Sequence, residues 1–207
     1  MVEQVKSIGA LHLQRVRFSY FYGFEPYTAR PTPQNPTPKP QFCVHGLMAP
    51  THPDVVNTAK VIEAVGQAKW GAQWPAIREA LKGQDRLCLH RGDITKAGQP
   101  EYAGLVFISA SNPKRFTIVD GDRSPLTEKD GRPYSGCYGN LIVDIWAQDN
   151  QFGKRINATV TGAQFVAHGE AFGAMSRAAA PDEFPDIGGA ADAPAPAAAA
   201  DPLAGLI

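Results

Sequence analysis

Aromatic rings alternate with small residues along one segment of this 207-residue chain, between Cys137 and Ala147. Its odd positions are small or apolar, whereas its even positions include Tyr138 and Trp146. In a β-strand, this pattern buries the small residues and presents two large rings to solvent. Exposed rings beside polar groups are typical of a surface that stacks on a flat partner, and a nucleobase is one such partner. The alternative is that both rings pack beneath a loop or in a dimer interface.

Basic residues lie close to aromatic residues at several other places. Such pairs suit the binding of a single strand, because the cation can meet a phosphate while the ring stacks on a base. The candidate nucleic-acid-binding residues are Arg15, Arg17, Phe18, Tyr20, Lys114, Arg115, Phe116, Arg132, Tyr134, Tyr138, Trp146, Phe152, Lys154 and Arg155. For any one pair, a solvated surface cation is the better explanation, so the prediction depends on their number. If about six cations meet phosphates, affinity should fall with a log–log salt slope of about −4.

The elements that position these residues are mostly strands. The hydrophobic patterns predict strands over 11–22, 86–91, 105–109, 115–119, 137–147 and 156–168, and two short helices within 51–83. The first strand changes its inward parity near Gln14, which predicts a β-bulge. Six prolines within 26–40 predict an extended loop. The fold class is therefore mainly β with a small helical insertion, and an OB-fold, a five- to six-stranded Greek-key barrel, is the first candidate.

Charge and composition divide the chain in two. Lysine plus arginine and aspartate plus glutamate number 20 each, but residues 177–207 hold five acids and one arginine. The body, 1–176, therefore has 19 basic and 15 acidic residues, a net charge of +4. In 177–207, 20 of 31 residues are alanine, proline or glycine. We expect a nucleic-acid-binding domain over 1–176 and a disordered acidic tail over 177–207.

The chain lacks the usual signatures of catalysis, metal binding and membrane insertion. Its three cysteines are 45 and 49 residues apart, which argues against a disulfide framework or a zinc site. No nucleotide-binding, serine-hydrolase or zinc-protease motif is present. The only dense acidic cluster is Asp120, Asp122, Glu128 and Asp130. We therefore expect no enzymatic activity, no cofactor, no metal and no membrane segment. A hydrolase or nuclease built on that cluster remains an alternative.

Several longer strings resemble the signature of the single-stranded DNA-binding proteins of tailed phages. They are 132–140 (RPYSGCYGN), 144–150 (DIWAQDN), 153–157 (GKRIN), 162–166 (GAQFV) and 169–173 (GEAFG). The resemblance is close over 132–173 and looser over the rest of the body. It implies an OB-fold and sequence-independent binding of single-stranded DNA in phage replication or recombination. It also implies a location in the cytoplasm of the infected bacterial host.

The resemblance extends to individual residues. It implies that Tyr134, Tyr138 and Trp146 stack on bases and that Lys154 and Arg155 contact phosphates. Proteins of this class often recruit replication or recombination proteins through an acidic tail, and the candidate segment here comprises Asp182, Glu183, Phe184 and Asp186. Outward-facing Ile142 and long edge strands predict that two copies could pair as a homodimer. A structural virion protein, a decoration or tail component with the same barrel, is the alternative function.

Overall fold

The computed structural model describes residues 8–31 and 36–173. Along the chain, the elements are β1 (Ala10–Tyr27), β2 (Gln41–Met48), α1 (Pro53–Trp70), α2 (Trp74–Gly83), β3 (Leu89–Arg91), α3 (Gly92–Thr95), β4 (Val106–Asn112), β5 (Thr117–Val119), β6 (Tyr138–Asn150) and β7 (Gly153–Ala167). Short 3-10 turns cover Gly71–Gln73, Pro100–Tyr102 and Glu128–Asp130. The acidic tail and its candidate partner-binding residues, Asp182, Glu183, Phe184 and Asp186, lie outside the described residues.

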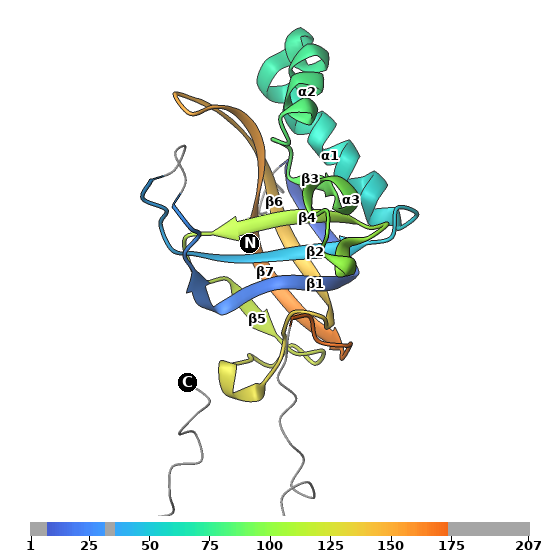
Figure 1. Cartoon of the computed structure of the whole chain (residues 1–207), viewed down its shortest axis with the longest axis vertical. Coiled ribbons are helices and arrows are strands. Elements are labelled where there is room, and N and C mark those ends of the chain that lie inside the picture. Colours follow the sequence, from blue (N-terminus) through green and yellow to red (C-terminus); the bar gives the residue numbers. More distant parts are fainter. Residues whose placement is uncertain (1–7, 32–35, 174–207) are drawn as a thin grey trace, which may run out of the picture. The chain divides into compact units, whose positions relative to one another are not determined.

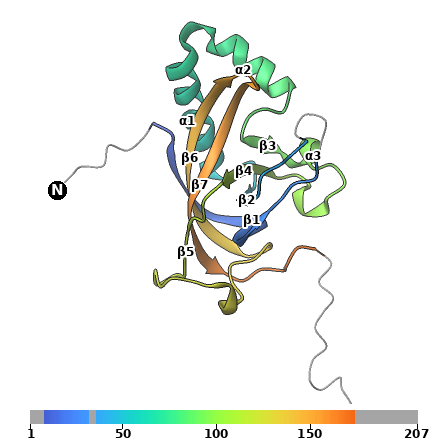
Figure 2. The same ribbon diagram turned by 90° about the vertical axis from the view of Figure 1, so that its left-hand side faces the viewer.

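Within the described residues, the strands form one seven-stranded sheet in the order β3-β4-β2-β1-β6-β7-β5. Neighbours are antiparallel except for β5 and β7, which are parallel. The sheet curls until β4 lies beside β7, where Asn112 Nδ2 donates a 2.7 Å hydrogen bond to the carbonyl oxygen of Val160 (Figures 1 and 2). This is the expected OB-fold with a helical insertion.

The register of the long first strand shifts at three places, the last of them between Tyr22 and Tyr27. Its register against β6 shifts between Leu13 and Val16, and Arg15 has a positive φ of 51°, which confirms the bulge expected near Gln14. A second irregularity, against β2, lies between Ser19 and Tyr22. It was not predicted, because Tyr20 and Tyr22 continue the inward parity of the residues before them. With Tyr20 at a φ of 47°, both tyrosines turn to the outer face of the barrel.

The barrel core is built from the alternation that the sequence shows. Leu141, Val143 and Ile145 of β6 are buried, whereas Tyr138 and Trp146 are exposed, as the pattern predicts.

The helices lie in the expected insertion. Helix α1 begins after His52, whose side chain accepts a hydrogen bond from the Asp54 amide, and it is followed by the capping residue Gly71. Of the three free cysteines, Cys88 and Cys137 are buried and Cys43 is half-buried. No helix among the described residues combines the length and apolarity that a membrane crossing requires.

The sequence analysis missed β2, although it is one of the central strands. Val44, Gly46 and Met48 point into the core, and Gln41, Cys43 and His45 lie on the opposite, outer face. The strand follows a proline-rich loop directly and contains a glycine, so it lacks the β-branched run that marks the other strands. Its outer face nevertheless supplies part of the candidate site.

Candidate nucleic-acid interface

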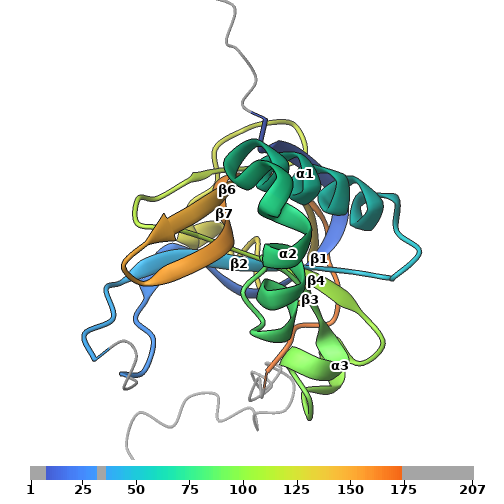
Figure 3. The same ribbon diagram turned by 90° about the horizontal axis from the view of Figure 1, so that it is seen from above.

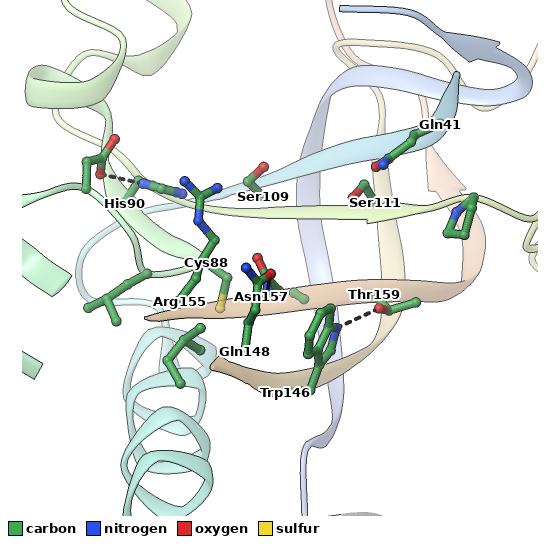
Figure 4. Close-up of a pocket in the computed structure, with 15 residues that line it drawn as sticks. Gln41, Cys88, His90, Ser109, Ser111, Trp146, Gln148, Arg155, Asn157 and Thr159 are labelled. Atoms are coloured by element: carbon green, nitrogen blue, oxygen red, sulfur yellow. Dashed lines mark hydrogen bonds and ion pairs between the residues drawn. The ribbon is translucent and has the colours of Figure 1, made fainter. Parts of the chain in front are cut away.

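A polar groove of about 430 Å³ runs between the outer face of β2 and β4 and the β6–β7 hairpin. We call it the hairpin groove (Figure 4). Its floor includes Gln41 of β2 and Ser109 and Ser111 of β4, with His90 at one end. The hairpin supplies the opposite wall, which consists of Trp146, Gln148, Arg155, Asn157 and Thr159. The groove therefore combines one large ring, one cation and a series of hydroxyl and amide groups.

Trp146 is the large ring of the hairpin groove and is 45% exposed. Its indole Nε1 donates a 3.0 Å hydrogen bond to Oγ1 of Thr159 on β7. Behind it along the hairpin, Asn157 Nδ2 donates to Oε1 of Gln148 at 3.1 Å. These cross-strand bonds fix the ring on its strand, so that it offers a pre-oriented stacking surface with little side-chain entropy left to lose.

Arg155 is the exposed cation of the groove wall, and Figure 4 shows its guanidinium reaching toward the floor. No ion pair involves this guanidinium in the part of the chain that the structure describes. Asp85, an acidic residue that also lines the groove, is bonded to the imidazole of His90, whose Nδ1 lies 2.7 Å from Asp85 Oδ1. Arg155 can therefore donate to an oxyanion in the groove without first breaking a salt bridge.

The base of the hairpin tip is fastened to the helices. Trp70 of α1 donates a 2.8 Å hydrogen bond from Nε1 to Oδ2 of Asp149, which also forms an ion pair with Lys154. The ammonium of Lys154 lies 5.6 Å from the centre of the Trp70 ring. The hydrogen bond from Lys154 and that from Trp70 hold the pKa of Asp149 below its usual value. Lys154 is therefore part of a structural anchor, whereas Phe152 at the tip is 72% exposed.

Two further candidate cations lie next to the groove. Pro113 lines its rim at the end of β4, and Lys114 and Arg115 follow directly with exposed side chains. The guanidinium of Arg115 lies 5.6 Å from the centre of the Phe24 ring. Of the candidate residues, the structure thus places Trp146 and Arg155 in the groove and Lys114 and Arg115 next to it in sequence, whereas Lys154 contacts Trp70 of α1 instead.

Phe18 and Phe116 were predicted as binding residues, but the structure places both in the core. Phe18 is completely buried, and its ring fills the space above Gly139, where a Cβ would come within 2.3 Å of Phe18 Cζ. Phe116 is 5% exposed and contacts Phe21 edge to face. Neither ring can stack on a base while the barrel is folded, so the prediction is wrong for these two residues.

Tyr138 and Trp146 do not form one platform, although both are exposed. They lie eight residues apart on β6, which corresponds to about 26 Å along a strand. Tyr138 is outside the hairpin groove and lies beside Arg17, whose guanidinium is 5.7 Å from its ring centre. That guanidinium also donates to the carbonyl oxygens of Gly136 and Glu170 at 3.0 and 2.9 Å. Arg17 therefore holds the chain's own backbone together.

The remaining candidates lie outside the groove as well. Tyr134 donates a 2.9 Å hydrogen bond to the carbonyl oxygen of Gly169, and Arg132 forms a 2.6 Å ion pair with Asp120. The Tyr20 ring lies beneath the ammonium of Lys96, at 4.4 Å, and beside the ring of His45. Arg15 is exposed at the first bulge, where its amide donates to Asn140. A homodimer through Ile142, which is exposed on β6, stays a prediction.

Most of the polar floor escaped the sequence analysis because its residues carry no distinctive motif. Gln41, Ser109 and Ser111 are ordinary residues until the topology places β2 beside β4 and both opposite the hairpin. Asn157 and Thr159 could have been found, since they share the outward parity of β7 with Arg155.

Comparison with known proteins places the chain in a family. Residues 10–193 match the family model described as Enterobacter phage Enc34, ssDNA-binding protein. The chain belongs to this family. Protein p50 of Acyrthosiphon pisum secondary endosymbiont phage 1 is 36% identical over 144 residues, which span 68% of this chain and 76% of that protein.

The solved structures show the same fold. The single-stranded DNA-binding protein of bacteriophage Enc34, in complex with ssDNA, matches with a TM-score of 0.65 and 22% identity, covering 81% of this chain and 91% of that one. A second structure of the bacteriophage Enc34 single-stranded DNA-binding protein matches with a TM-score of 0.63. It covers 86% of this chain and 90% of that chain. OB-folds bind oligonucleotides across their second and third strands, between the loops that follow strands one and four. In this chain, the corresponding elements are β2, β4, the β1–β2 loop and the β6–β7 hairpin. Figure 3 shows the hairpin and the described ends of the loop on the same side of the sheet.

Proposed function

We propose that this protein binds single-stranded DNA without sequence preference and acts in phage DNA replication or recombination in the cytoplasm of the infected host. Membership in the Enc34 single-stranded DNA-binding family supports this function, and nothing in that membership supports the alternative of a virion component. The single observation that carries the proposal is the position of Trp146. Its exposed ring, fixed by Thr159, shares the hairpin groove with the guanidinium of Arg155, which forms no ion pair with another described residue.

The groove chemistry accounts for tolerance of sequence. Every base has a π-face, so stacking on Trp146 does not depend on which base is present, and it contributes about 1–3 kcal/mol. The floor and walls offer serine and threonine hydroxyls and glutamine and asparagine amides, which can both donate and accept hydrogen bonds. Such groups can adjust to different base edges, whereas Arg155 contacts the phosphate that every nucleotide shares.

The proposal includes no catalytic step. In the acidic loop, Asp120 binds Arg132, Asp122 accepts from both the amide and hydroxyl of Ser124, and Asp130 accepts from Thr127. These hydrogen bonds hold the pKa of each of the three carboxyls below its usual value. The carboxylates thus serve as turn and cap acceptors, which is a structural use.

Fluorescence anisotropy tests the function directly. Labelled oligo-dT, a mixed-sequence single strand and a duplex are titrated with the full chain at 50 and 200 mM salt, with a magnesium incubation to detect cleavage. We expect similar affinities for the two single strands, weaker duplex binding, affinity that falls steeply with salt, and intact DNA. The proposal would be refuted if the chain bound neither single strand, or if it cleaved the DNA in the presence of magnesium.

A further inference from the structure

A second aromatic surface lies on the same outer face as the floor of the hairpin groove, on β1, the strand that pairs with β2. The rings of Tyr22 and Tyr27, both on β1, stack with their centres 4.8 Å apart and their planes inclined by 28°. We call them the tyrosine pair. Tyr27 is 39% exposed, so the stack presents ring surface to solvent.

The strand register connects the tyrosine pair to the groove. Tyr22 lies opposite Cys43 of β2, which lies opposite Ser111 of β4, and Tyr27 lies opposite Gln41. Ser111 and Gln41 both line the hairpin groove. Residues directly opposite each other are about 5 Å apart, so Tyr22 is about 10 Å from Ser111 across two strands. The outer face is therefore continuous from the groove floor to the tyrosine pair.

The path between the two aromatic surfaces suits an extended strand of nucleotides. Trp146 stands on one side of it and the tyrosine pair on the other, and small or polar side chains, Ser109, Ser111, Cys43 and Gln41, lie between them. Small residues let a sugar–phosphate backbone approach the sheet, and rings at both ends can each take a base. The β1–β2 loop continues directly from Tyr27, as expected for the second flank of such a path.

We propose that Tyr22 and Tyr27 form a second stacking station for single-stranded DNA. A strand that stacks on Trp146 crosses β4 and β2 and ends with a base on the tyrosine pair at β1. This inference rests on the proposed function. It adds the path that the bound DNA follows and requires that the DNA be long enough to reach both aromatic surfaces.

A length series tests the inference. Affinities of the full chain and of Tyr27→Leu are measured for oligo-dT of about 4 to about 16 nucleotides, the range covered by single OB-folds. The matched controls are Tyr27→Phe, which keeps the ring, and Val56→Ala, which truncates an exposed side chain of α1 outside the groove. We expect Tyr27→Leu to match the unmodified chain on the shortest oligonucleotides and to bind the longest ones about 5- to 100-fold more weakly. Both controls should follow the unmodified chain at every length.

Other outcomes overturn the inference. An equal loss at every length would mean that Tyr27→Leu merely disturbs the barrel, and no loss at any length would mean that the pair does not touch DNA. If the unmodified chain bound no oligo-dT, the proposed function itself would fail, which is a different result.

Alkylation of Cys43 gives a second readout, with buried Cys88 and Cys137 as internal references. Because burial raises the pKa of the Cys43 thiol to about 11, the reaction is run at alkaline pH. Long oligo-dT should protect Cys43, and absence of protection would contradict the path.

Discussion

The indole nitrogen of Trp146 on β6 is hydrogen-bonded to the hydroxyl of Thr159 on β7, at 3.0 Å. The bond runs across the hairpin and ties the exposed ring to the neighbouring strand. It satisfies the only polar atom of the indole, so the π-faces are what remains for a ligand. The geometry explains how a large apolar side chain can stay at the surface in one orientation.

Loss of the Trp146 ring should weaken DNA binding. We expect Trp146→Leu to lower the affinity for oligo-dT about 5- to 100-fold, because one stacked base is lost, and Trp146→Phe to retain most of it. Thr159→Val keeps the shape of the threonine but removes the acceptor, and its effect should be smaller, about 2- to 10-fold. Anisotropy titrations measure all three. Full affinity in Trp146→Leu would show that the ring has another purpose.

Arg155 should contribute one phosphate contact. Arg155→Gln is expected to reduce the log–log salt slope of single-strand binding by about 0.7, because one fewer counterion is displaced. Arg123→Gln is the matched control, since Arg123 is exposed beside a different cavity, lined by Thr117, Ile142 and Thr161. Equal slopes for the two variants would contradict the assignment of Arg155 to the DNA.

The contact between Trp70 and Asp149 should hold the hairpin against α1. Trp70→Phe removes the N–H donor but keeps a ring, and we expect it to lower the free energy of unfolding by about 1–3 kcal/mol. Amides around 148–154 should also exchange faster with solvent, because the hairpin tip has lost an anchor. Urea unfolding and hydrogen exchange measure the two effects. Unchanged exchange at the hairpin would rule out the anchoring role.

Phe18 should behave as a core residue. Phe18→Ala is expected to cost about 3–5 kcal/mol of unfolding free energy, because it leaves a cavity above Gly139. At a temperature where the variant is still folded, its affinity for oligo-dT should match that of the unmodified chain. A variant with normal stability and impaired binding would restore Phe18 to the DNA interface.

His45 should make the fold sensitive to mild acid. Burial, followed by repulsion from Lys96 and His90, lowers its pKa to about 3, from about 6.5 in an unfolded chain. Between these values the unfolded state binds a proton that the folded state does not, so stability falls as the pH drops below about 6.5. The slope can reach about 1.4 kcal/mol per pH unit. In urea titrations between pH 7 and 5, His45→Asn should flatten this dependence, and an unchanged slope would disprove the assignment.

Much of the barrel could be predicted because alternation in β6 and β7 reflects burial directly. Leu141, Val143 and Ile145 face inward as the pattern requires, and the slip near Gln14 correctly marks a bulge. The second bulge at Tyr20 could not be inferred, since its positive φ leaves no mark on the hydrophobic pattern. For that reason, the sequence did not predict that Tyr22 and Tyr27 stack on the outer face.

The binding site was harder to predict than the fold. Alternation selected Trp146 and proximity to a ring selected Arg155, and the two lie in one groove. Proximity also selected Arg17 and Arg132, which bind the chain's own carbonyl and carboxylate groups. Adjacent strand residues point to opposite faces, so a ring next to a cation is often inside the core, as Phe116 is beside Arg115. Only the three-dimensional arrangement of β2, β4 and the hairpin distinguishes the cations and rings that line the groove from those that contact the chain itself.

Photochemical crosslinking tests the position of the DNA most directly. An oligo-dT carrying 5-iodouracil is irradiated on the full chain, and the modified peptides are mapped by mass spectrometry. Single-stranded DNA in the hairpin groove predicts adducts on Trp146, with Tyr22 or Tyr27 joining when the oligonucleotide is long. Adducts confined to Tyr138 and the outer face around Ile142, with Trp146 unmodified, would contradict it.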